Sequence, residues 1–187
     1  MSMSAKNSRT SSVASELGLA RPAAVGAVLV LALAVQSTLL TKVTVLGVIP
    51  QLLFVVVVSL AYLEGENMGV VVGFSGGLLQ DFLLPQSILG LTALVYVLIA
   101  YGVGSLRQFA PSTSVWMPVF AVAVASAVAE GSYALLAITM GQQWVSITDT
   151  AKIAGLVVLY NTLLTPFVFP LVRRVADRFR PERVMRI

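Results

Sequence analysis

Six apolar stretches, each about long enough for a helix to cross lipid, constrain the fold of this chain more than any other feature. A helix needs roughly 20 residues to span the ~30 Å hydrocarbon core of a bilayer. A backbone inside lipid must satisfy its own hydrogen bonds, and continuous apolar runs favour helices over a barrel. The predicted spans are approximately 22–40, 46–63, 67–84, 87–105, 115–140 and 151–172. The sequence therefore predicts an all-α, polytopic membrane protein with six transmembrane helices.

The composition agrees with this class. Hydrophobic residues make up 58% of the 187 residues and charged residues 11%, whereas soluble proteins average about 25% charged residues. The chain contains neither cysteine nor histidine, so thiolate and imidazole groups are excluded from any metal site or catalytic centre. We expect no cofactor and no metal.

The polar ends of the chain are expected to be cytoplasmic. Residues 1–21 form a Ser-rich stretch that we expect to be a retained, flexible tail, because the first apolar run follows without a small-residue cleavage site. Residues 22–172 form the transmembrane domain and 173–187 a basic tail. Lysine and arginine gather at both ends and in the 4–5 loop, which indicates that both termini face the cytoplasm. The basic residues on that side are Lys6, Arg9, Arg21, Arg107, Arg173, Arg174, Arg178, Arg180, Arg183 and Arg186.

The basic C-terminal tail has three interpretations. It can serve only as a topology signal, it can attract anionic lipid at about 1 kcal/mol per basic residue near the surface, or it can bind a cytoplasmic partner. Binding to nucleic acid is not expected, because the charge clusters only beside a membrane helix.

Four glycines in the third predicted span indicate close helix packing. Gly69, Gly73 and Gly77 are spaced by four residues and form one stripe on a helix, and Gly76 widens it. Small residues at this spacing let helices approach closely in lipid, where packing drives association. The pattern predicts a seam with a neighbouring helix or a partner.

Gln80 and Asp81 follow the glycines near the outer end of the same span. Asp81 has two interpretations, because a carboxylate costs less near the interface than at mid-membrane. It marks the point where the helix meets water, or it faces a neighbouring helix and caps the turn beside Pro85.

Glu130 lies well inside the fifth predicted span. A buried carboxylate must have a partner or stay protonated. Candidate partners are Asn161, Thr162, Thr165, Ser132 and the groups around Gln80. We favour a structural polar contact over a proton or ion relay, because a relay needs several titratable sites along a path.

The sixth predicted span contains Pro166 and Pro170. Each removes one backbone hydrogen bond, so the helix should kink or end near them. Asn161 and Thr162 are expected to donate interhelical hydrogen bonds.

A search for catalytic motifs finds one match, which the rest of the chain does not support. Residues 73–76 spell G-x-S-G, as around the nucleophile of rhomboid-type intramembrane proteases, but that serine needs a histidine base. We therefore expect a protein that is not an enzyme.

The ordered motifs resemble the MreD family of bacterial rod shape-determining membrane proteins. The resemblance rests on "GFSGGLLQD" with "SILGLTALVYVLIAYGVG", on "IPQLLFVVVVSLAYLEG", and on "NTLLTPFVFPLVRRV", in order from Pro50 to Arg174. It implies a non-enzymatic scaffold of the cell-elongation machinery in the inner membrane. It also implies MreC as the partner, with RodA, a class B penicillin-binding protein and MreB as members of the complex.

The same resemblance implies a six-helix fold similar to the substrate-binding subunits of energy-coupling-factor vitamin transporters. Such a subunit is the alternative function, and it would bind its ligand near Trp144, Gln142, Gln143 and Tyr133. A third class, an ion or proton carrier, would require activity to depend on Glu130.

Overall fold

The computed structural model describes residues 3–42, 47–83, 89–109, 116–139 and 147–178. The regular structure of these residues is helical, apart from a single bridge residue, Val48. The helices, in chain order, are α1 (Met3–Thr38), η1 (Leu40–Lys42), α2 (Leu52–Glu64), α3 (Glu66–Leu83), α4 (Leu91–Leu106), η2 (Arg107–Phe109), α5 (Trp116–Thr139) and α6 (Ile147–Arg178). The all-α prediction is confirmed.

Four of these helices are long and apolar enough to cross a membrane. Their spanning portions are Arg21–Lys42, Leu91–Phe109, Trp116–Leu136 and Ala151–Arg178. The apolar helix α2 has only 13 residues, and α3 has 18 residues that include four glycines and several polar side chains. Composition and helix length together make this a membrane protein.

The second predicted span differs most from its helix. We predicted 46–63, whereas α2 begins at Leu52. Gly47 has a positive φ of 81°, which does not fit a helix. Pro50 also disfavours helical backbone at the residue before it. Residues 47–51 therefore approach α2 as irregular chain. The N-terminus of α2 lies inside the protein, because Leu53 in its first turn is fully buried.

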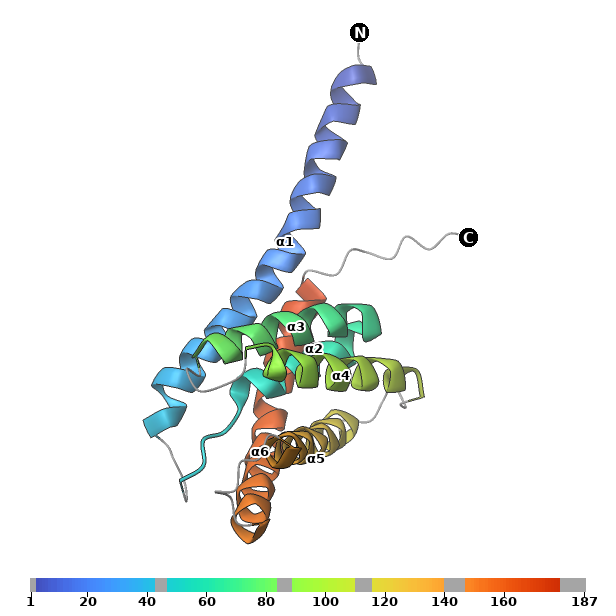
Figure 1. The fold of residues 1–187 in the computed structure, drawn as a ribbon. Coiled ribbons are helices and arrows are strands. Elements are labelled where there is room, and N and C mark those ends of the chain that lie inside the picture. The colour runs from blue at the N-terminus through green and yellow to red at the C-terminus, as the bar shows by residue number, and fades with distance from the viewer. Residues whose placement is uncertain (1–2, 43–46, 84–88, 110–115, 140–146, 179–187) are drawn as a thin grey trace.

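The first helix is longer than its predicted span. Although we predicted a flexible tail over residues 1–21, α1 has helical backbone from Met3. Adding residues to an existing helix gains one hydrogen bond per residue without a new nucleation step. Pro22 lies inside α1 and does not end it. In Figure 1 the N-terminal part of α1 extends away from the other helices.

The core is built around α2, which contacts α1, α3, α4, α5 and α6. Ten of its residues are buried. Phe54 on α2 meets Tyr96 on α4 edge to face, with ring centroids 5.1 Å apart. The helices α3 and α4 lie side by side (Figure 1) and make the most extensive helix–helix contact in the described chain, whereas α4 and α5 touch much less.

Helix α6 continues through Pro166 and Pro170 to Arg178. A helix can pass a proline at the loss of one backbone bond when neighbouring groups compensate. The hydroxyls of Thr165 and Thr162 bond within α6, to the Asn161 carbonyl over 2.7 Å and to the Val158 carbonyl over 2.6 Å. These are not the carbonyls that the prolines leave without an N–H, which belong to Thr162 and Pro166. The hydroxyl of Thr162 therefore bonds within its own helix and not to another helix as expected.

Candidate functional site

The glycine stripe of α3 faces α4 within the same chain. A Cβ atom added at Gly69 would lie 2.8 Å from the Ala100 carbonyl oxygen, and one at Gly73 would lie 2.8 Å from the Tyr96 carbonyl oxygen. One at Gly77 would lie 2.3 Å from Ala93 Cα. Cβ contacts shorter than 3.0 Å with backbone atoms force the helices to move apart. This seam therefore holds two neighbouring helices of the monomer together.

Gly76 lies on a different side of α3 and faces α2. A Cβ atom there would lie 2.6 Å from Val57 Cγ2, at the end of a side chain. The neighbouring Ser75 is half-buried, and its hydroxyl donates to the Val71 carbonyl of its own helix over 2.7 Å. Gly76 thus lets α3 approach α2 while the other three glycines let it approach α4.

Asp81 is 3% exposed and lies against the first turn of α4. Its Oδ2 accepts hydrogen bonds from the backbone N–H of Gly90 at 2.8 Å and of Ala93 at 3.4 Å. The first N–H groups of a helix have no partner within the helix, and negative charge is favoured there. Asp81 therefore caps α4 from a neighbouring helix. Pro85 lies outside the described residues.

The buried start of α2 is capped by two side chains from other helices. Gln36 Oε1 on α1 accepts from the Leu53 N–H at 2.9 Å, and Asn161 Oδ1 on α6 accepts from the Gln51 N–H at 3.0 Å. An unsatisfied N–H in an apolar environment costs several kcal/mol. These amides satisfy backbone N–H groups at the start of α2, inside the protein.

The side chains of Gln36, Asn161 and Gln51 also form hydrogen bonds to further helices. Gln36 Nε2 donates to Gln80 Oε1 on α3 at 3.2 Å, and Asn161 Nδ2 donates to Ser126 Oγ on α5 at 3.1 Å. Gln51 Nε2 donates to Glu130 Oε1 on α5 at 3.0 Å. We call this set, Gln36, Gln51, Gln80, Ser126, Glu130 and Asn161, the polar cluster. It joins α1, α3, α5 and α6 to the N-terminus of α2.

The partner of Glu130 differs from the candidates named from sequence. Glu130 accepts from Gln51, while the hydroxyl of Ser132 donates to the Val128 carbonyl of its own helix. Sequence reasoning missed Gln51, Gln36 and Ser126. Two features of the sequence could have indicated these residues. Gln36 is a single amide near the end of an apolar run. Gln51 directly follows Pro50, and a helix is expected to start at or after a proline because the residue before it disfavours helical backbone.

The polar cluster consists of amide side chains, one hydroxyl and one carboxylate, so Glu130 is its one titratable group. Among the described residues, no three acidic side chains come together as a metal site. The ligand residues suggested for a vitamin-binding subunit, Trp144, Gln142 and Gln143, lie outside the described part of the chain. Tyr133 is half-buried on α5.

Several basic residues lie at one end of the helix bundle. Arg21 pairs with Glu64 at the end of α2, and Arg107 approaches Gly65, which follows Glu64. A small recess beside Arg21 and Glu64 is also lined by Val172 and Ala176 near the end of α6. On the adjoining turns Arg173, Arg174 and Arg178 are exposed, and Arg173 pairs with Asp177 at 3.6 Å. Arg180, Arg183 and Arg186 lie outside the described residues.

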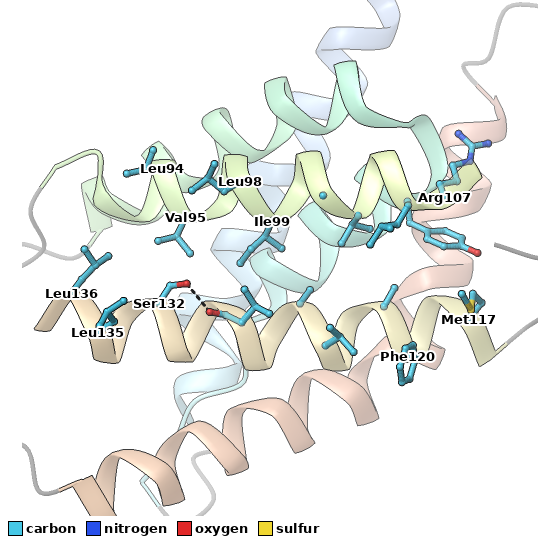
Figure 2. A pocket seen from close by; sticks show the side chains of 18 residues that line it. Leu94, Val95, Leu98, Ile99, Arg107, Met117, Phe120, Ser132, Leu135 and Leu136 are labelled. Carbon is cyan, nitrogen blue, oxygen red and sulfur yellow. Dashed lines mark hydrogen bonds between the residues drawn. The ribbon is translucent and has the colours of Figure 1, made fainter. Parts of the chain in front are cut away.

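A long apolar groove separates α4 from α5 (Figure 2). It encloses about 580 Å³, and the side chains that line it are mostly aliphatic. Arg107, Met117 and Phe120 lie at one end, and Leu135 and Leu136 at the other (Figure 2).

Comparison with known protein families identifies one match. The model of the family described as rod shape-determining protein MreD matches residues 21–175. No protein of curated function and no solved structure matches the chain.

Proposed function

The chain belongs to the MreD family of rod shape-determining proteins, and from this we propose that it is a non-catalytic membrane scaffold of the bacterial cell-elongation machinery. It maintains rod shape by binding MreC and by linking the MreB cytoskeleton to the peptidoglycan synthases RodA and a class B penicillin-binding protein. The observation that carries the proposal is the match over residues 21–175, which takes in the apolar part of α1 and almost all of the other five helices.

The topology that we propose has six spans in the plasma membrane, with both termini cytoplasmic. The 13 residues of α2 rise about 20 Å, and the five preceding residues, if extended, add about 16 Å, which together suffice for the ~30 Å core. The grouping of Arg21, Arg107 and the basic end of α6 at one end of the bundle supports this orientation.

The buried polar groups form contacts between helices, as expected of a scaffold. Gln36 and Asn161 cap α2, Asp81 caps α4, and Glu130 is bonded to Gln51. Each holds helices together, which gives MreC a defined surface to bind. The vitamin-transporter alternative is not favoured, because the family match places the chain among shape-determining proteins. The similarity of fold to those transporter subunits rests on the sequence resemblance alone.

The test is co-purification of the tagged full-length protein from its native membrane in mild detergent, with a tag-only membrane as control. We expect MreC to be recovered, together with RodA and its transpeptidase partner. Recovery of a transporter coupling subunit with ATPases, or of the folded protein without MreC, would contradict the proposal.

A further inference from the structure

The volume of the α4–α5 groove is that of a site for a small ligand. Pockets that bury small ligands measure about 300–1,000 Å³. The groove encloses about 580 Å³. A partner helix could rest on its rim, but the space between α4 and α5 suits a slender, flexible hydrocarbon chain.

The length of the groove suits a chain from one leaflet of the bilayer. About 20 Å of helix separates Leu94 on α4 from Arg107, which begins η2 directly after α4, and one leaflet contributes about 15 Å of hydrocarbon. Val124, Val128 and Leu98 line the stretch between its ends. The Ser132 hydroxyl, also in the lining, is bonded to the Val128 carbonyl within its own helix (Figure 2).

The two ends of the groove differ in charge. Arg107, directly after α4, lies at the same end as Met117 and Phe120 of α5, and its guanidinium points away from α5, whereas Leu135 and Leu136 lie at the other end (Figure 2). Trp116, 79% exposed, begins α5 at the Arg107 end, and tryptophan is enriched at membrane–water interfaces. The nearby carboxylates have other contacts, because Glu64 pairs with Arg21 and Glu66 accepts from Ser105 at 3.0 Å.

We propose that the groove binds one anionic phospholipid, with an acyl chain between α4 and α5 and the phosphate at Arg107. The aliphatic lining buries the chain, and the guanidinium pairs with phosphate through parallel N–H groups. The lipid fills the space that α4 and α5 leave between them and fixes their separation. This site is distinct from the basic tail after α6.

The test uses fluorescence quenching by brominated lipid. The chain has two tryptophans, Trp116 and Trp144, so Trp144→Phe leaves Trp116 as the only reporter. The full-length protein is placed in phosphatidylcholine vesicles that contain the same small fraction of either brominated phosphatidylglycerol or brominated phosphatidylcholine. We expect an apparent preference of about fivefold for phosphatidylglycerol, because one basic residue at the membrane surface contributes that much.

Two variants test the two parts of the site. Arg107→Gln should abolish the preference, whereas Arg107→Lys should retain most of it. Gly102 lines the groove, and a Cβ atom there meets nothing within 4 Å, so Gly102→Leu should fill the groove and lower quenching by the anionic lipid to the level of phosphatidylcholine.

Matched controls separate this site from the basic tail and from general effects. Gly131→Leu adds a leucine where a Cβ atom also meets nothing, and Arg174→Gln removes an exposed charge on α6; both should retain the preference. Equal quenching by the two lipids in the parent protein would overturn the proposal. So would a preference that survives both Arg107→Gln and Gly102→Leu, which would assign the lipid to the tail or the groove to another occupant.

Discussion

Gly77 on α3 and Ala93 on α4 lie so close together that a Cβ atom on Gly77 would be 2.3 Å from Ala93 Cα. Asp81, one turn further along α3, accepts from the backbone N–H of the same Ala93. The glycine stripe and the carboxylate therefore act at one contact, where α4 begins. Glycine permits the approach, and the carboxylate satisfies the helix end that the approach buries.

Replacing Gly77 should destabilise the monomer. Gly77→Ala places a methyl group against backbone and should cost at least the ~1–3 kcal/mol typical of overpacking, and Gly77→Leu should cost more. The measurement is thermal unfolding in detergent. Gly131→Ala is the matched control, because its Cβ atom meets nothing within 4 Å; Ser75→Ala should also be nearly silent. Equal melting temperatures for Gly77→Ala and Gly131→Ala would rule out the seam.

Removing the Asn161 amide should destabilise the packing around the start of α2. Asn161→Leu leaves the Gln51 N–H and the Ser126 hydroxyl without this partner. Each buried donor or acceptor that loses its hydrogen bond lowers the free energy of unfolding by about 1–3 kcal/mol. Thr162→Val, one residue on, should have little effect because that hydroxyl bonds within α6. Equilibrium unfolding in detergent compares the two. If Asn161→Leu is as stable as Thr162→Val, the amide does not cap α2.

The two roles considered for Glu130 give opposite results for Glu130→Gln. A structural contact survives, because the amide oxygen can still accept from Gln51 Nε2, so rod shape should be restored in cells that lack the native protein. Glu130→Leu should fail to restore it, because it removes the acceptor. A Glu130→Gln protein that is folded, binds MreC and yet leaves cells round would instead indicate a titratable role.

Asp81 should be sensitive to loss of its oxygen atoms rather than of its charge alone. Asp81→Ala leaves the Gly90 and Ala93 N–H groups without this acceptor and should cost about 1–3 kcal/mol. Asp81→Asn keeps one acceptor and should lose less. Hydrogen exchange of the first turn of α4 measures the effect directly. Unchanged protection in Asp81→Ala would contradict the capping role.

Much of the fold could be predicted from the order of residues in the chain. Apolar runs of spanning length predict helices, because a backbone in lipid has to bond within itself. The four-residue spacing of Gly69, Gly73 and Gly77 predicts a face that packs closely, because it is a local property of one helix. The motifs that resemble the MreD family agree with the match over residues 21–175.

The helix ends and the pairings could not be predicted in this way. We placed the start of the second span before Pro50, because hydropathy does not register the backbone geometry that delays α2 until Leu52. The sequence left open whether the glycine stripe meets a neighbour or a partner, and the structure places α4 against it. It did not reveal that Glu130 meets Gln51, which is 79 residues earlier in the chain.

Helix ends and pairings could not be predicted because the properties that can be recognised in a sequence act over only a few residues. Hydrophobicity, helix periodicity and proline geometry act within a few residues, so the amino-acid sequence alone identifies an all-helical membrane protein with a small-residue face and buried polar groups. The choice of partner for each buried group depends on how the helices pack around α2. Gln36 and Asn161 became recognisable as caps only when packing brought the start of α2 to them. Packing also decided between the two interpretations of Asp81, because it brought the start of α4 to that carboxylate.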